Sequence, residues 1–175
     1  IREHEVTAES ANPGSAAAAI HVPLADDPRS LWCLQYGLSH FDQLFTPRQL
    51  VALTTFSDLV GEAREQIRKD AISAGLPDDD HSFDAGGTGA KAYAEAVSVY
   101  LSFGTDRSAD FWSNLCFWAN QPKNELVAHL FTRQAIPMAW DFAEANPFSS
   151  SGGNFDKNLD YVVKGIQFLP GNVAG

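Results

Sequence analysis

The stretch TPRQLVALTTFSDLVGEAREQIRKDAISAG, residues 46–75, decides the predicted fold. Thr46 can accept a hydrogen bond from a free amide of the first helical turn, and Pro47 loses no intrahelical bond at the first helical position. Apolar side chains then recur every three or four residues, at Leu50, Leu53, Phe56, Val60, Ala63, Ile67 and Ala71. This spacing places them on one face of a helix. The sequence therefore predicts a long helix that ends near Gly75 and Pro77.

Three further helices are predicted after a polar loop rich in glycine and aspartate, residues 76–89. The first has apolar positions Tyr93, Val97, Tyr100 and Leu101 and continues toward Phe111 and Leu115. The apolar positions of the second are Leu126, Leu130, Phe131 and Ala135. Those of the third are Leu159, Val162, Val163 and Ile166. Pro137 is expected to kink or end the middle helix, and residues 138–145 are expected to form a short helix before Asn146 and Pro147. Because no run alternates with period two, the predicted fold class is all-α, an irregular domain of about four to five helices.

The chain is expected to divide into an arm and one helical domain. Residues 1–30 combine acidic residues, small residues and three prolines with few large apolar groups, which predicts an extended or partly ordered arm. Residues 31–175 are expected to form the helical domain, in which residues 31–45 pack onto the core as a short helix or irregular structure. The sequence begins at Ile1, and its only methionine is Met138. We therefore expect an excised fragment of a larger protein.

The composition argues against a surface that is basic throughout. The 175 residues include 22 acidic and 12 basic side chains, which give a formal net charge of -10. Nonspecific binding to nucleic acid requires Lys and Arg to displace counterions from phosphates, so any contact with a polyanion must be local. Residues 46–75 carry equal numbers of acidic and basic side chains. This predicted helix is therefore better suited to such a contact than the acidic loop that follows it.

The cysteines and the apolar segments indicate the cellular setting. Cys33 and Cys116 show no CxxC spacing and are too few for a disulfide framework, so we expect buried thiols in a reducing compartment. No segment reaches the roughly 20 apolar residues of a membrane span. The run AAAAIHVPLA, residues 16–25, is too short and lacks the basic flank of a signal peptide. The prediction is a cytoplasmic protein with no membrane partner.

The residues show no self-contained active site. The segment DAGGTGAKAY, residues 84–93, superficially resembles a glycine loop that cradles a nucleotide or the methionine end of S-adenosylmethionine. Such loops follow a strand, so a linker is favoured. Asn, Pro and Phe at residues 146–148 share part of the Asn/Asp-Pro-Pro-aromatic motif of amino-methyltransferases, although helix termination also explains them. Asp141 and Glu144 could act as paired carboxylates or be solvated helix charges. The five histidines have no metal-ligand spacing, so no metal site is predicted.

Two long blocks of sequence resemble a known family. YGLSHFDQLFTPRQLVALTTFSDLVGEAR, residues 36–64, and FTRQAIPMAWDFAEANPFSSSGGN, residues 131–154, are similar to an internal part of the prokaryotic adenine-specific DNA methylases that also carry an N-terminal domain of unknown function and a zinc-ribbon segment. The resemblance covers roughly residues 31–170. It implies that the parent protein is a Rossmann-like enzyme that transfers a methyl group from S-adenosylmethionine to adenine N6.

The resemblance also implies that this segment is not the catalytic part. In the family, the cofactor loop precedes the matched region and the Asp-Pro-Pro-Tyr motif follows it, and neither motif nor the ribbon cysteines occur in these 175 residues. No catalytic, cofactor-binding or metal-binding residue is therefore assigned. The matched positions that could contact substrate or DNA are Arg48, Gln49, Arg133, Gln134, Asp141 and Asn146. Ordinary structural roles remain open, such as an ion pair for Arg133.

The leading functional hypothesis is a non-catalytic helical domain of an S-adenosylmethionine-dependent DNA adenine-N6 methyltransferase. It would shape the substrate or target-recognition side, with the parent's catalytic core as its partner and with DNA bound through the parent. The alternative is a structural or protein-interaction module that has no contact with nucleic acid. That alternative predicts an exposed apolar patch and self-association of the excised segment.

Overall fold

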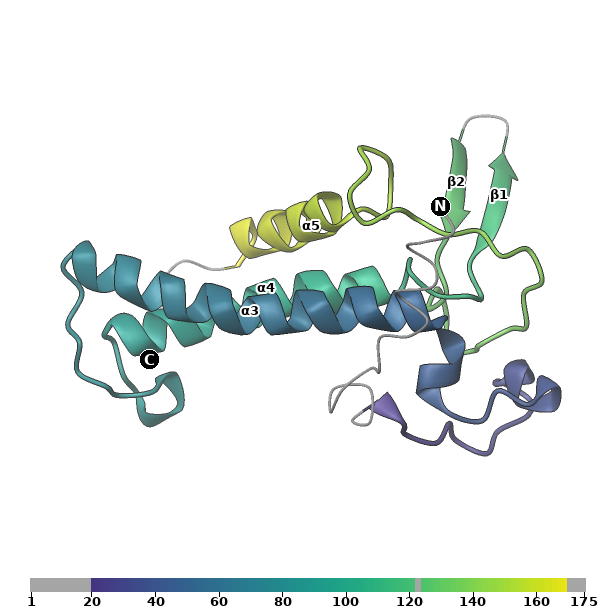
Figure 1. Ribbon diagram of the computed structural model, residues 1–175, viewed down its shortest axis with the longest axis horizontal. Coiled ribbons are helices and arrows are strands. Elements are labelled where there is room, and N and C mark those ends of the chain that lie inside the picture. Colours follow the sequence, from purple (N-terminus) through teal and green to yellow (C-terminus); the bar gives the residue numbers. More distant parts are fainter. Residues whose placement is uncertain (1–19, 122–123, 170–175) are drawn as a thin grey trace. The chain divides into compact units, whose positions relative to one another are not determined.

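The computed structural model describes residues 20–121 and 124–169 (Figure 1), so most of the predicted arm, residues 1–19, lies outside the described residues. The described residues belong to two compact units, one from Ile1–Thr54 and Arg107–Lys157 and the other from Thr55–Asp106 and Asn158–Gly175. The elements in chain order are the 3-10 helices η1 (Trp32–Tyr36) and η2 (Phe41–Leu44), α3 (Pro47–Ser73), the 3-10 helix η3 (Phe83–Ala85), α4 (Ala90–Ala109), β1 (Phe117–Gln121), β2 (Asn124–Ala128) and α5 (Phe155–Gln167).

The long helix forms where the apolar spacing predicts it. Helix α3 begins at Pro47 and ends at Ser73. Gly75 stops it because its φ of 97° lies in the left-handed region, which glycine adopts without a Cβ penalty. The backbone N–H of Gly75 donates to the carbonyl of Ile72 at 2.9 Å, and that of Leu76 donates to Ala71 at 3.0 Å. The helices predicted around residues 93–101 and 159–166 are also present, as α4 and α5.

The all-α prediction is wrong, because a β-hairpin follows α4 (Figure 1). Strands β1 and β2 pair antiparallel, with Phe117 opposite Ala128 and Gln121 opposite Asn124. The predicted helix with Leu126 and Leu130 on one face is therefore replaced by a strand. Leu126 is 40% exposed on β2, whereas Leu130 lies beyond the strand and is buried. The four-residue spacing of Leu126 and Leu130 therefore does not come from one helical face, because one residue lies on the strand and the other in the core.

Residues 138–145 do not form the predicted short helix either. They have no regular secondary structure. Phe142 has φ 59°, a left-handed conformation that a non-glycine residue does not adopt inside an α-helix. Instead of about four to five helices, the described residues contain three α-helices, α3, α4 and α5, together with the hairpin.

The first unit has an apolar core built largely from irregular segments. Its buried members are Leu24, Cys33, Leu44, Leu115, Leu130 and Ile136, from segments far apart in the sequence. A parallel bridge joins Leu31 to Ile136, and the backbone N–H of Trp32 donates to the carbonyl of Ile136 at 3.0 Å. The Ser113 hydroxyl donates to the carbonyl of Leu44 at 2.8 Å. These bonds satisfy backbone groups that neither helix nor sheet would pair.

The second unit contains most of α3 and α4 and the part of α5 from Asn158 onward. Buried alanines are prominent in it: Ala71 of α3 and Ala90, Ala92 and Ala94 of α4. The glycine- and aspartate-rich loop connects α3 to α4, as predicted, and contains η3. The glycine cluster therefore follows the 3-10 helix η3. A nucleotide-binding glycine loop would instead follow a strand.

Candidate functional site

A capping box at the start of α3 positions the first candidate residues. The Thr46 backbone N–H donates to Gln49 Oε1 at 2.8 Å, and the Gln49 backbone N–H donates to Thr46 Oγ1 at 3.4 Å. This reciprocal pair satisfies two backbone donors at the helix start, and Pro47 supplies the favourable first helical residue. The local sequence therefore fixes the helix start, and with it the places of Arg48 and Gln49.

Glu144 binds both of these side chains. Arg48 Nε donates to Glu144 Oε1 at 3.1 Å, and Arg48 Nη2 donates to Oε2 at 2.6 Å, so the guanidinium grips both carboxylate oxygens. Gln49 Nε2 donates to Oε1 at 3.0 Å. Two-pronged Arg–carboxylate contacts fix orientation as well as charge. The network joins residues 36–64 to residues 131–154.

The same residues line an open cleft of about 350 Å³ in the first unit. Its lining consists of Arg48, Gln49, Ala52, Trp112, Glu144, Ala145, Asn146 and Pro147. Trp112 is 1% exposed, and its indole N–H donates to the carbonyl of Gly153 at 2.8 Å. Asn146 Oδ1 accepts the backbone N–H of Phe148 at 2.9 Å, which stabilises the Asn-Pro turn. The cleft thus combines polar side chains that are largely bonded to one another with the edge of a buried indole.

The other three candidates do not line this cleft. Asp141 accepts the backbone N–H of Trp118 at 2.5 Å and so attaches the segment after Pro137 to strand β1. Arg133 and Gln134 are exposed. The structure therefore brings Arg48, Gln49 and Asn146 together, and places Arg133, Gln134 and Asp141 elsewhere on the first unit.

The sequence offers no sign that Ala52, Trp112 and Ala145 line this cleft. Trp112 falls just after α4, where the pattern predicts a continuing helix, so nothing in the sequence distinguishes it from a residue on an apolar helical face. The sequence presents Glu144 either as a carboxylate paired with Asp141 or as a solvated helix charge. In the structure these two carboxylates bind different partners, Arg48 and the backbone of Trp118. Side-chain contacts across such long sequence separations have no local signal.

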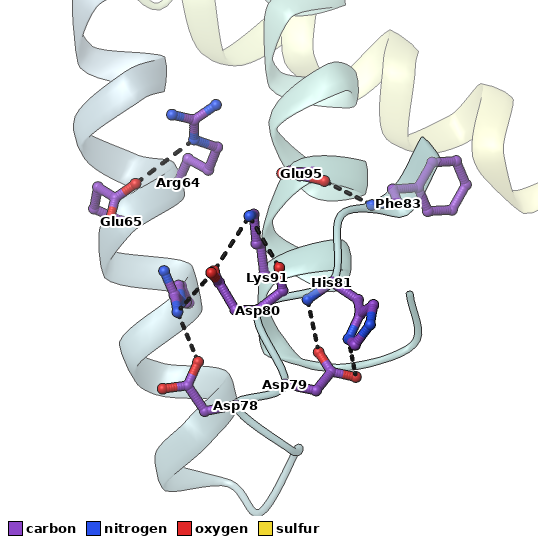
Figure 2. Close-up of polar contacts among 10 residues, drawn as sticks. Arg64, Glu65, Asp78, Asp79, Asp80, His81, Phe83, Lys91 and Glu95 are labelled. Carbon is purple, nitrogen blue, oxygen red and sulfur yellow. Dashed lines mark hydrogen bonds and ion pairs between the residues drawn. The ribbon is translucent and has the colours of Figure 1, made fainter. Parts of the chain in front are cut away.

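A second polar network ties the acidic loop of the second unit to two helices (Figure 2). Arg68 Nη2 of α3 lies 2.7 Å from Asp78 Oδ1 and 3.6 Å from Asp80 Oδ1, and Lys91 Nζ of α4 lies 3.2 Å from the same Asp80 oxygen. Hydrogen bonding from Lys91, reinforced by charge attraction, lowers the pKa of Asp80. The hydrogen bond to Asp78 raises the pKa of Arg68. These basic side chains are therefore already paired with carboxylates.

Close packing of this loop explains why residue 89 is a glycine. A Cβ placed on Gly89 would overlap the Asp79 carboxylate and the carbonyl of Pro77. The backbone N–H of Ala90 donates to that same carbonyl at 2.8 Å, which closes the loop onto the start of α4. The glycine is needed for internal packing in this loop.

Neither cysteine lines the cleft. Cys33 and Cys116 are free and buried, as the sequence predicts, and burial raises the pKa of Cys116 to about 11. Among residues 20–121 and 124–169, no group of three or more His, Cys, Asp or Glu side chains could hold a metal ion. In the same part of the chain, no helix has the length and apolar character needed to cross a membrane.

Comparisons with protein-family models, with curated proteins and with solved structures gave no match.

Proposed function

We propose that this chain is a non-catalytic domain of an S-adenosylmethionine-dependent DNA adenine-N6 methyltransferase, and that it shapes the substrate side of the parent enzyme. The observation that carries the proposal is the contact of Arg48 and Gln49 with Glu144, which unites residues 36–64 with residues 131–154. These are the two blocks that resemble the methylase family. Their convergence on one cleft supports a shared role for them.

The lining of the cleft supports a binding role rather than a catalytic one. It contains no Ser, Cys, His or Lys that could serve as nucleophile or general base, and its carboxylate, Glu144, already accepts three hydrogen bonds. Asn146 and Trp112 add an amide and an indole. In this proposal the methyl donor and the catalytic residues come from the parent's core. The proposed location is the cytoplasm, where reducing conditions keep thiols free.

A cleft-filling variant tests the proposal. Ala52 is half-buried on α3 and lines the cleft, so Ala52→Leu narrows it without removing a hydrogen bond. Ala63→Leu on the same helix is the matched control, because Ala63 is also half-buried and does not line the cleft. We expect weak binding of a short adenine-containing duplex at low salt, measured by fluorescence anisotropy, to fall for Ala52→Leu and to persist for Ala63→Leu. Equal binding by both variants, or none by the unmodified chain, would contradict the proposal.

The second candidate, a protein-interaction module without nucleic-acid contact, is favoured by the exposed apolar side chains of the second unit. Its helices expose Leu59, Ile72, Tyr93, Val99, Phe103, Tyr161 and Val163. Such surface is unfavourable in water and favours association with another protein surface. This candidate predicts concentration-dependent self-association of the isolated chain in sedimentation velocity. A strictly monomeric chain at high concentration would count against it.

A further inference from the structure

A second hollow in the first unit is walled by aromatic rings. Trp32 and Tyr36 come from η1 and Trp140 from the segment after Pro137, and together with Gln35 and Met138 they line a cavity of about 320 Å³. The rings of Tyr36 and Trp140 meet edge to face, with centroids 5.3 Å apart and an angle of 87° between their planes. The two rings therefore form two adjacent, nearly perpendicular walls of the cavity.

The backbone holds this arrangement in place before any ligand arrives. The Trp32 indole N–H donates to the carbonyl of Arg29 at 2.8 Å, and the Trp32 backbone N–H is bound to Ile136. Met138 packs against the apolar core of the unit. Gly37, with φ 89°, ends η1 directly after Tyr36. The Trp32 and Met138 walls therefore need little ordering on binding, which lowers the entropic cost of association.

These three aromatic rings are exposed to a degree that packing alone does not require. Trp32 is 50% exposed, Tyr36 is 56% exposed and Trp140 is 73% exposed. Large aromatic side chains contribute most of the binding energy at interfaces, and grouped exposure of this kind marks interaction sites. The hollow is thus open at its aromatic side and accessible to a group carried at the end of a longer chain.

The charge of the protein selects the chemistry of the ligand. The face of an aromatic ring is electron-rich and attracts a cation, most strongly at tryptophan. The lining contains no charged side chain, so it offers nothing to pair with a phosphate or a carboxylate. The protein as a whole carries a formal charge of -10, which attracts cations.

We propose that Trp32, Tyr36 and Trp140 form an aromatic cage that binds an alkylated ammonium group carried on a lysine side chain of a partner polypeptide. The quaternary or methylated ammonium sits against the ring faces, and its methyl groups displace water from the apolar walls. An unmodified lysine ammonium is more strongly hydrated and binds less tightly. This inference is independent of the proposed methyltransferase role, because it uses none of the residues of the Arg48 cleft.

A set of matched peptides tests the charge requirement. Short peptides of one sequence would carry trimethyllysine, lysine or norleucine at one position, and their affinities for the full chain would be measured by isothermal titration calorimetry. We expect trimethyllysine to bind about tenfold more tightly than norleucine. Choline and its neutral isostere 3,3-dimethylbutan-1-ol repeat the comparison with free small molecules. Equal affinity for charged and neutral members, or tighter binding of choline than of the trimethyllysine peptide, would overturn the proposal.

Substitutions then locate the site. Trp140→Ala is expected to weaken binding of the trimethyllysine peptide about tenfold. Trp140→Phe keeps an aromatic ring that attracts cations less strongly, so its affinity should lie between those of the unmodified chain and Trp140→Ala. Phe83→Ala is the matched control, because Phe83 is 61% exposed and lies in the other unit. Circular dichroism checks that each variant is folded. Retained affinity in Trp140→Ala, or tighter binding of oligothymidylate than of the peptide, would refute an ammonium cage.

Discussion

Replacing Glu144 with alanine removes the contact between the start of α3 and the segment after Pro137. The Arg48 and Glu144 side chains are 48% and 31% exposed, so solvent limits their ion pair to about 0.5–1 kcal/mol of stability. Gln49 is only 4% exposed, and its Nε2 would lose its acceptor, Glu144 Oε1. Leaving this donor unpaired costs about 1–2 kcal/mol more. Together these losses lower the free energy of unfolding by about 2 kcal/mol.

Urea unfolding monitored by circular dichroism measures this loss. Glu144→Gln keeps an oxygen acceptor without the charge and should lose about half as much. Glu65→Ala is the control, because its carboxylate lies 3.7 Å from Arg64 Nε and both side chains are well exposed. That variant should stay within about 0.5 kcal/mol of the unmodified chain. If Glu144→Ala and Glu65→Ala lose the same small amount, the network does not hold the cleft together.

Three other predictions concern buried and charged groups. Trp112→Phe removes the indole donor to Gly153 and leaves a void at a fully buried position, so stability measured by urea unfolding should fall by about 2–3 kcal/mol. Burial raises the pKa of Cys116 to about 11, so a thiol-reactive dye at pH 8 should not label it until urea unfolds the chain; labelling of the native chain would contradict the burial. The hydrogen bond from Lys91 lowers the pKa of Asp80, so the contact stabilises the loop at neutral pH and is lost as the pH falls through the folded pKa, below 3.8. The protection of the loop amides from hydrogen exchange, taken relative to the intrinsic exchange rate at each pH, should therefore fall in that acidic range, and less so in Asp80→Asn.

The helices were predictable because their signals are local. Thr46 caps the helix as predicted, by accepting a hydrogen bond from the Gln49 backbone N–H, and Gly75 stops the helix by its left-handed conformation. The apolar spacing that follows has a period close to that of an α-helix. All of this information lies within a few residues of the element it defines.

The hairpin was not predictable by the same means. A strand shows alternation only when one of its faces is buried, and β1 has both faces largely exposed, with Phe117 43% and Trp118 48% exposed. The segment after Pro137 was misread for a related reason. Asp141 and Glu144 have the spacing of one helical turn, yet each binds a distant part of the chain. Tertiary contacts therefore override the local pattern in these two segments.

Ion pairs between distant parts of the chain also have no local signal in the sequence. These pairs decide which arginines are suitable for a test of DNA binding. Charge summed along the sequence separates a neutral helix from an acidic loop, but folding pairs Arg68 with Asp78 and Asp80 (Figure 2). Arg48 is likewise held by Glu144. Reversing either arginine would break an internal ion pair, so a loss of DNA binding in such a variant could report misfolding.

Arg133 offers a cleaner test. It is exposed, and no carboxylate among residues 20–121 and 124–169 lies within ion-pair distance of it. Arg133→Glu should therefore leave the urea midpoint unchanged while weakening a phosphate contact and flattening its salt dependence. Fluorescence anisotropy with a short duplex at several salt concentrations measures both effects. An unchanged affinity and salt slope would remove Arg133 from the proposed DNA contacts and strengthen the interpretation of the chain as a protein-interaction module.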